Sequence, residues 1–149
     1  MIVDVHTHTP THREAVPESE LLSFSGWRSD RPVTTTNSWA DYDRKMAAAD
    51  VTIVFNIAVD NPLEATGLPY PPERTNDATA EFVANDPTQR IGFMSVNPLW
   101  PNVFDEAERC RDLGLVGVKL GPNYQNFDPL CDEAHAFYAY CERNALQYA

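Results

Sequence analysis

The sequence predicts an α/β fold with a parallel sheet, because short apolar runs alternate along the chain with segments of helical pattern. Two of these runs, TIVFNIA and RIGFMSV, are apolar at nearly every position, as in strands that helices cover. The order is β-α-β-α-β-α-β-α, which favours right-handed βαβ units joined into one sheet. A chain of 149 residues is enough for one domain or part of one.

Each element can be placed from its pattern. The strands are expected at residues 2–5, 52–58, 90–96 and 116–120. A helix is expected after each strand, within SWADYDRKMAAAD, NDATAEFVAND, NVFDEAERCRDLG and DPLCDEAHAFYAYCERNALQ. The residues expected to begin or end these helices are Ser38 with Asp41, Asn76 with Pro87, Asn102 with Gly114, and Pro129. Long loops, 10–37 and 60–75, follow the first two strands, at the end of the sheet where α/β folds place their sites.

The composition excludes several classes of partner. The net charge is −11 and the pI is near 4.6, so the chain repels phosphate backbones and nucleic acid is not expected as a partner. The apolar runs are far shorter than the roughly 20 residues of a membrane span, and no signal-peptide pattern opens the chain. The three cysteines have no CxxC spacing and are expected as helix thiols in a cytoplasmic protein.

The stretch IVDVHTHTP places two histidines at the end of the first strand. If the strand continues to His8, then Asp4, His6 and His8 share one face, and Val3 and Val5 face helices on the other. Two imidazoles on one side suit a divalent metal, with zinc expected first, and Asp4 could orient a ligand histidine. The alternative is a polar strand end without a metal; the position of the pair, before a long loop, favours the metal.

Other strands also end in polar residues. Asn56 and Asn97 are candidate substrate-binding residues, although asparagine also serves turns. Lys119 is the candidate catalytic residue, on an apolar strand between Gly117 and Gly121, which leave room beside it. The lysine could hold a substrate carboxylate, lie near the metal or form a carbamate between two metals, or it could extend to solvent.

Five further residues have expected roles outside this group of strand ends. In the first long loop, Trp27, Arg28 and Arg31 could contact an anionic aromatic substrate or be solvated. Trp100 is expected to pack against its neighbours, and His135 to be structural.

Four segments resemble the amidohydrolase superfamily when they are taken in order: VDVHTHTP, ADVTIVFNIA, DPTQRIGFMSVNP and DLGLVGVKLGPNYQNFDP. Within it they resemble the amidohydrolase-related group, which includes metal-dependent hydrolases and decarboxylases. The resemblance implies a (β/α)8 TIM barrel with parallel strands and a metal at their C-terminal ends, and His6 and His8 match its first-strand pair. It also implies a histidine from the fifth strand and an aspartate from the eighth, which have no match here.

A barrel of this kind takes about 250 residues, so residues 1–149 are expected to be its N-terminal half, four βα units, with the C-terminal half absent. The resemblance then implies a metal-dependent hydrolase that uses a metal-activated water on a small ester, amide or cyclic carboxylic acid, with little turnover by this fragment alone. The alternatives are a nonoxidative decarboxylase on the same scaffold, a phosphoesterase that also begins with an HxH strand, and a non-catalytic fragment. An open half-barrel exposes strand edges, and a homo-oligomer is one way to cover them.

Overall fold

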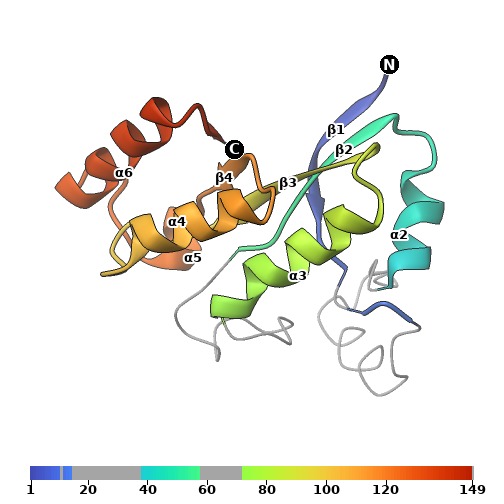
Figure 1. Cartoon of the computed structure of the whole chain (residues 1–149), viewed down its shortest axis with the longest axis horizontal. Coiled ribbons are helices and arrows are strands. Elements are labelled where there is room, and N and C mark those ends of the chain that lie inside the picture. Colours follow the sequence, from blue (N-terminus) through green and yellow to red (C-terminus); the bar gives the residue numbers. More distant parts are fainter. Residues whose placement is uncertain (11, 15–37, 58–71, 149) are drawn as a thin grey trace, which may run out of the picture.

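The computed structural model describes residues 1–10, 12–14, 38–57 and 72–148. The strands of this part are β1 (Val3–His8), β2 (Val51–Phe55), β3 (Arg90–Ser95), β4 (Gly117–Lys119) and β5 (Gln147–Tyr148). The helices are α2 (Trp39–Met46), α3 (Pro72–Asn85), α4 (Val103–Asp112), α5 (Pro122–Gln125) and α6 (Asp132–Arg143). Figure 1 shows the strands and helices following one another along the chain.

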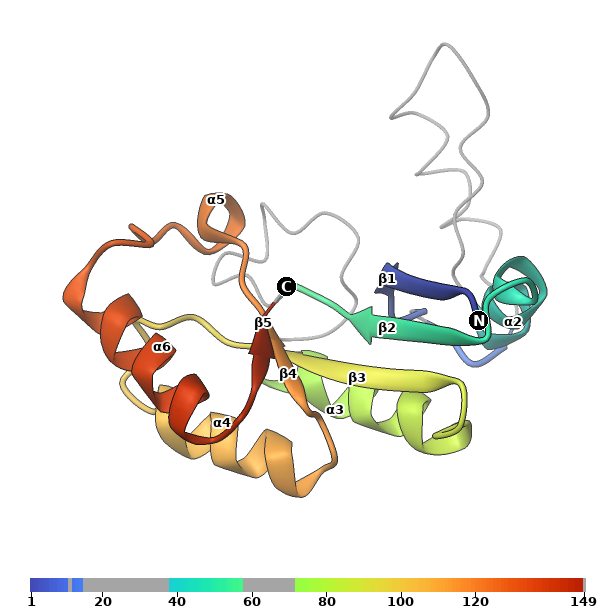
Figure 2. The ribbon, with the colours of Figure 1, turned by 90° about the horizontal axis from the view of Figure 1, so that it is seen from above.

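The strands form one sheet in the order β1-β2-β3-β4-β5, and every pair of neighbours is parallel. The predicted parallel α/β sheet is therefore confirmed. Each strand adds beside the one before it, without the reversal of strand order found in doubly wound sheets. Figure 2 shows α3 and α4 along one face of this sheet.

Several element boundaries differ from those predicted. β1 continues to His8, and a short β5 pairs with β4 where the resemblance expected a fifth strand. Ser38 caps α2 as predicted, with its hydroxyl accepting from the Asp41 amide. Asn102 was predicted to cap α4 but makes no side-chain capping bond. α6 begins only at Asp132 rather than near Pro129, because the Cys131 thiol caps it by accepting from a backbone amide.

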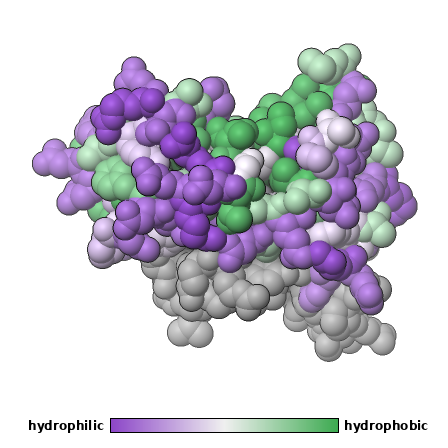
Figure 3. Space-filling model, in the orientation of Figure 1, coloured by the Kyte–Doolittle hydropathy of each residue, from purple (hydrophilic) through white to green (hydrophobic). Residues whose placement is uncertain are grey.

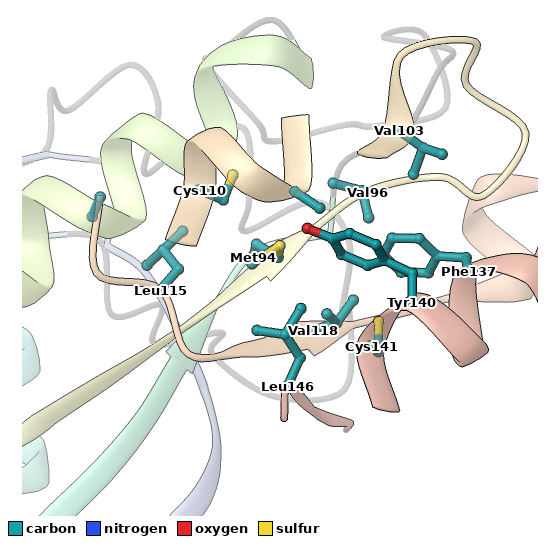
Figure 4. Close-up of a cluster of buried hydrophobic side chains, with 12 residues drawn as sticks. Met94, Val96, Val103, Cys110, Leu115, Val118, Phe137, Tyr140, Cys141 and Leu146 are labelled. Carbon is teal, nitrogen blue, oxygen red and sulfur yellow. The ribbon is translucent and has the colours of Figure 1, made fainter. Parts of the chain in front are cut away.

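The larger apolar cluster lies between β3, β4, α4 and α6, and we call it the large core (Figure 4). Its members include Met94 and Val118 from the strands, Cys110 from α4 and Phe137 from α6, all fully buried. The ring of Phe137 stacks against Tyr140 at 5.9 Å between centroids. Trp100 packs against this cluster, as predicted. Burial of apolar surface is the main stabilising force for this part of the fold.

A smaller cluster joins α2, β2 and α3, and we call it the small core. It consists of Tyr42, Val54 and Phe82, with the Tyr42 and Phe82 rings edge to face at 4.9 Å. Arg90, at the start of β3, is buried beside it, with its guanidinium 3.8 Å above the Phe82 ring. The same guanidinium donates to the Phe82 carbonyl and pairs with Asp43. A buried arginine with these partners ties both helices to the sheet.

The prediction that Val3 and Val5 are covered by helices is wrong. They are 42% and 60% exposed, and Ile2 beside them is 60% exposed. Within the described residues β1 pairs with β2 alone, and a bulge interrupts its alternation. Figure 3 shows hydrophobic surface at the end of the molecule that carries the N-terminus.

Candidate metal centre

The two histidines of β1 lie side by side at the C-terminal end of the sheet. Their ring centroids are 5.5 Å apart, with the ring planes inclined at 60°, and each residue keeps part of its surface exposed. The strand continues to His8, which was the condition for His6 and His8 to lie on one face. Its register against β2 shifts between Asp4 and Thr7, however, which marks a β-bulge in the middle of the motif.

Phe55, the last residue of β2, forms the floor beneath the histidines. Its ring centroid lies 5.0 Å from that of His6 and 5.2 Å from that of His8, both edge to face. Phe55 itself is fully buried. Sequence reasoning missed this residue, although its place directly before Asn56 at the end of a strand was a usable signal. An apolar floor restricts water on one side of the imidazoles and holds their rings in place.

Asn56 contacts His8 and the backbone that follows it. It is buried at 4% exposure, and its amide group donates to the Thr9 carbonyl at 3.5 Å. Burial and the nearby His6 lower the pKa of His8, while a hydrogen bond with the Asn56 side chain acts in the opposite direction. The net shift favours neutral His8, and a neutral imidazole is the form that binds a metal.

Lys119 reaches the same group of residues from β4. Its Nζ lies 4.9 Å from the centroid of Phe55, a cation–π contact. Its charge also contributes to the lowered pKa of His8. Among the described residues, no carboxylate forms a salt bridge with Lys119. The ammonium therefore lies beside the imidazoles with an aromatic ring as its described partner.

The prediction that glycines leave room beside Lys119 is wrong. A Cβ on Gly117 would lie 2.4 Å from the ring of Phe93, so that ring already occupies the space. A Cβ on Gly121 would approach Ile57 and Tyr124 at 3.3 Å. Gly117 thus allows Phe93 to pack flat against the strand, and the lysine is held by Phe55 instead.

Asn97 bonds the turn after β3 and the helix α5. It is 1% exposed, its Nδ2 donates to the Gln125 carbonyl at 2.8 Å, and its Oδ1 accepts from the Leu99 amide at 3.0 Å. Both ends of the amide are thus used to hold the turn after β3 and the helix α5. Its role in binding substrate stays a prediction, whereas its structural role is visible.

The other candidates lie away from this group or outside the described residues. His135 is exposed on α6, with its ring against that of Tyr138 at 5.9 Å. Trp27, Arg28 and Arg31 fall outside the described residues. The structure therefore brings together His6, His8, Asn56 and Lys119, around a phenylalanine that was not predicted.

The donor set fits part of a metal site. His6 and His8 supply two imidazoles on one side of β1, and the lowered pKa of His8 keeps its lone pair available. Within the described residues, no group of three or more histidine, cysteine, aspartate or glutamate side chains could hold a metal ion. A catalytic zinc site usually has three protein ligands, so the pair accounts for two of them.

Among the helices of the described residues, none has the length and apolar character that a membrane span needs.

Solved structures of similar fold were found. A 4-oxalomesaconate hydratase from Rhodopseudomonas palustris matches with a TM-score of 0.61 and 17% identity, over 99% of this chain and 51% of that chain. A probable 2-pyrone-4,6-dicarboxylic acid hydrolase from Acinetobacter baumannii, with citric acid bound, matches at 0.58 and 13%, over 99% and 48%. A dihydroxybenzoic acid decarboxylase from Polaromonas sp. JS666, with bound manganese and the inhibitor 2-nitroresorcinol, matches at 0.59 and 20%, over 99% and 48%.

These identities are low, so the likeness shows the fold, and the chain spans about half the length of the structures it matches. Its four parallel βα units therefore correspond to about half of an amidohydrolase barrel, which confirms the fold expected from the resemblance. No curated protein sequence matches the chain significantly. The amidohydrolase family pattern matches residues 3–148, nearly the whole length, and the chain therefore belongs to the amidohydrolase family.

Proposed function

We propose that this chain supplies two ligands of the divalent-metal centre of a hydrolase that acts on a small ester, amide or cyclic carboxylic acid. The observation that carries the proposal is the convergence of His6, His8, Asn56 and Lys119 around the ring of Phe55. These side chains come from β1, from the end of β2 and from β4, and they meet at the C-terminal ends of the strands, where barrel enzymes hold their sites.

Each residue has a distinct role in this proposal. His6 and His8 bind the cation, and Asn56 holds His8 in place through its side-chain amide. A bound divalent cation supplies Lewis acidity, with zinc as the first candidate. Lys119 binds an anionic group of the substrate, since its ammonium has no described carboxylate partner and Phe55 holds it beside the histidines. In a chain of net charge −11, a local cation is needed to bind an anionic substrate.

Decarboxylation is the second candidate for the same site. Lys119 would orient a carboxylate in either reaction, so its position does not separate the two. A decarboxylase with bound manganese shares the fold, which supports a lyase on this scaffold and a metal other than zinc. The reaction products separate the candidates: hydrolysis transfers oxygen from ¹⁸O-labelled water into the acid product, and decarboxylation releases carbon dioxide.

The remaining ligands belong, in this proposal, to strands outside the described residues. The chain spans about half of its structural relatives, and the described part contains two histidine donors at the site. We propose that residues 1–149 form the N-terminal part of one barrel domain, and that they turn over substrate slowly or not at all without the other half.

A metal titration of the 149-residue chain tests the proposal. Zinc chloride and manganese chloride are titrated by calorimetry into the wild type and into the variants His6→Ala, His8→Ala and His135→Ala. His135 is the matched control, because it is an exposed histidine on α6 away from the pair. We expect either alanine in the pair to weaken zinc binding by at least about tenfold, with the control within about twofold of wild type by the same scale. Equal losses in all three variants, or none in the pair, would contradict a metal centre at His6 and His8.

A further inference from the structure

The bulge in β1 lies inside the histidine motif. Asp4 pairs with Thr52 and Thr7 pairs with Val54, so two residues of β1, Val5 and His6, face the single residue Ile53 of β2. A bulge of this kind removes backbone groups from the hydrogen-bonded ladder and redirects the side chains around it. His6 is one of its residues, and His8 lies two residues further along the strand.

Two side chains bond the backbone groups at the bulge. The Asp4 carboxylate accepts a hydrogen bond from the His6 amide, with 3.0 Å between Oδ1 and N. The Thr7 hydroxyl donates to the carbonyl of Ile53, opposite the bulge, with 2.7 Å between the oxygens. Both backbone groups are thus bonded by side chains from the histidine motif itself, one from each side of the bulge.

A third side chain fixes the threonine from the helix layer. The Tyr42 hydroxyl of α2 lies 2.8 Å from Thr7 Oγ1. Thr7 has one hydroxyl proton and gives it to Ile53, so Tyr42 is the donor in this bond. Tyr42 and Thr7 are buried, at 3% and 8% exposure. The chain Tyr42–Thr7–Ile53 therefore connects α2 to the bulge without solvent in between.

We propose that Asp4 and Thr7 are positioning residues that set the bulge and thereby the directions of His6 and His8. This inference rests on the proposed metal centre, but it concerns the backbone of this chain. Asp4 was expected from the sequence to orient a ligand histidine through the imidazole. The Asp4 carboxylate instead accepts a hydrogen bond from the main-chain N–H of His6. Asp4 therefore acts as a hydrogen-bond acceptor at the bulge, and its charge is not required.

Two pairs of variants test these hydrogen bonds. The Asp4 pair separates the acceptor oxygen from the charge, and the Thr7 pair separates the hydroxyl from the shape of the side chain. Asp4→Asn keeps an oxygen acceptor for the His6 amide and removes the charge, whereas Asp4→Ala removes both. Thr7→Ser keeps the hydroxyl, and Thr7→Val removes it in a side chain of the same shape. Asp50→Ala is the matched control, because the Asp50 carboxylate also accepts from a backbone amide next to β1, that of Ile2 at 2.6 Å, but away from the bulge.

Two readouts are used on the 149-residue chain. The first, without metal, is nuclear magnetic resonance of the His6 amide exchange rate and of the imidazole ring shifts of His6 and His8. The second is the zinc affinity by calorimetry with zinc chloride. Asp4→Ala and Thr7→Val should speed exchange of the His6 amide, move both ring signals and weaken zinc binding by about ten- to a hundredfold. Asp4→Asn, Thr7→Ser and Asp50→Ala should stay within about threefold of wild type in zinc affinity by the same scale.

Two results would overturn the inference. First, if Asp4→Asn weakens zinc binding as much as Asp4→Ala does, the charge of Asp4 matters. Second, if folded Asp4→Ala leaves the His6 amide exchange rate and the imidazole ring shifts unchanged, the bulge does not depend on Asp4. If an alanine or valine variant fails to fold, Asp4→Asn and Thr7→Ser still decide. A loss of affinity in Asp4→Asn contradicts the acceptor role of Asp4, and a loss in Thr7→Ser contradicts the role of the Thr7 hydroxyl. A wild type that binds no zinc would refute the proposed function alone, since the metal-free signals still test the positioning residues.

Discussion

The two halves of the sheet are stabilised in different ways. The half made of β3 and β4 packs against α4 and α6 through the large core, where Met94, Val118 and Phe137 are fully buried. The half made of β1 and β2 has only the small core in its described part. It relies on buried polar groups, such as Thr7 of β1 and the guanidinium of Arg90, which reaches the small core from the start of β3. The candidate metal centre lies in this second half, with Lys119 reaching into it from β4.

The difference shows that one half of the sheet mainly stabilises the fold, whereas the other half orients particular side chains. Apolar burial is strong but has no direction, so the large core can stabilise the fold without fixing any particular side chain. Hydrogen bonds contribute less net stability but have strict geometry. The polar half is therefore the part in which two imidazoles can be held in a defined arrangement. Variants of each half should separate these effects.

The largest expected effect is in the large core. Phe137→Ala removes a fully buried ring that stacks on Tyr140, and it should lower the free energy of unfolding by about 3–5 kcal/mol. Urea unfolding followed by circular dichroism measures this loss. Leu130→Ala is the control, because Leu130 is 75% exposed and should change stability by less than about 0.5 kcal/mol. A loss below about 1 kcal/mol for Phe137→Ala would show that the large core does not dominate stability.

The polar half should respond next, to the loss of Arg90. Arg90→Met keeps an unbranched apolar side chain at this position but removes the guanidinium over Phe82, the donor to the Phe82 carbonyl and the partner of Asp43. A buried carbonyl left unbonded costs about 1–3 kcal/mol, and we expect a loss of that size. Arg44→Met, which breaks the exposed pair with Asp41, should cost less than about 0.5 kcal/mol. Similar losses for the two variants would mean that burial of the guanidinium adds nothing.

A pH-dependent contribution is expected from Glu106 of α4. Burial raises the pKa of this carboxyl, but hydrogen bonds from Arg109 and Asn76 lower it more, so the net pKa lies below its ordinary value. A lowered pKa means that the ionised group stabilises the fold above its ordinary pKa, and that this stability is lost as the pH falls through the pKa of the folded state.

Glu106→Gln should therefore cost about 1–2 kcal/mol near pH 7, from the weaker bonds of a neutral acceptor. The difference from wild type should shrink as the pH falls below about 4. Urea unfolding at a series of pH values measures it. A difference that stays constant down to pH 3, or grows there, would contradict a stabilising carboxylate at this position.

The sequence predicted the sheet well because apolar runs and helix patterns are local signals. Its parallel strands, the Ser38 cap and the grouping of His6, His8, Asn56 and Lys119 at one end of the sheet are all found in the structure. The bulge was not predictable, since it depends on the register between β1 and β2, which no single segment encodes. Phe55 was missed because its run is apolar at nearly every position, and its place directly before Asn56 was the one signal that it faces the site.

The last prediction changes no residue and compares how fast the cysteines react. Those buried in the large core should react more slowly than the one at its surface. Burial raises the pKa of Cys141 to about 11, and burial also raises the pKa of Cys110. Both are inaccessible, whereas Cys131 caps α6 at a partly exposed position. Iodoacetamide at pH 8, followed by peptide mass spectrometry, should modify Cys131 first. Modification of Cys110 or Cys141 at the same rate would indicate that the large core opens readily.

The most direct test of the metal centre is X-ray diffraction from crystals of the 149-residue chain soaked in zinc chloride, with data collected on both sides of the zinc absorption edge. The arrangement of His6 and His8 around Phe55 predicts an anomalous peak between the two imidazoles, about 2.0–2.1 Å from one nitrogen of each. Anomalous peaks only at other sites, such as His135 or Cys131, with none between His6 and His8, would contradict a metal centre at the end of β1.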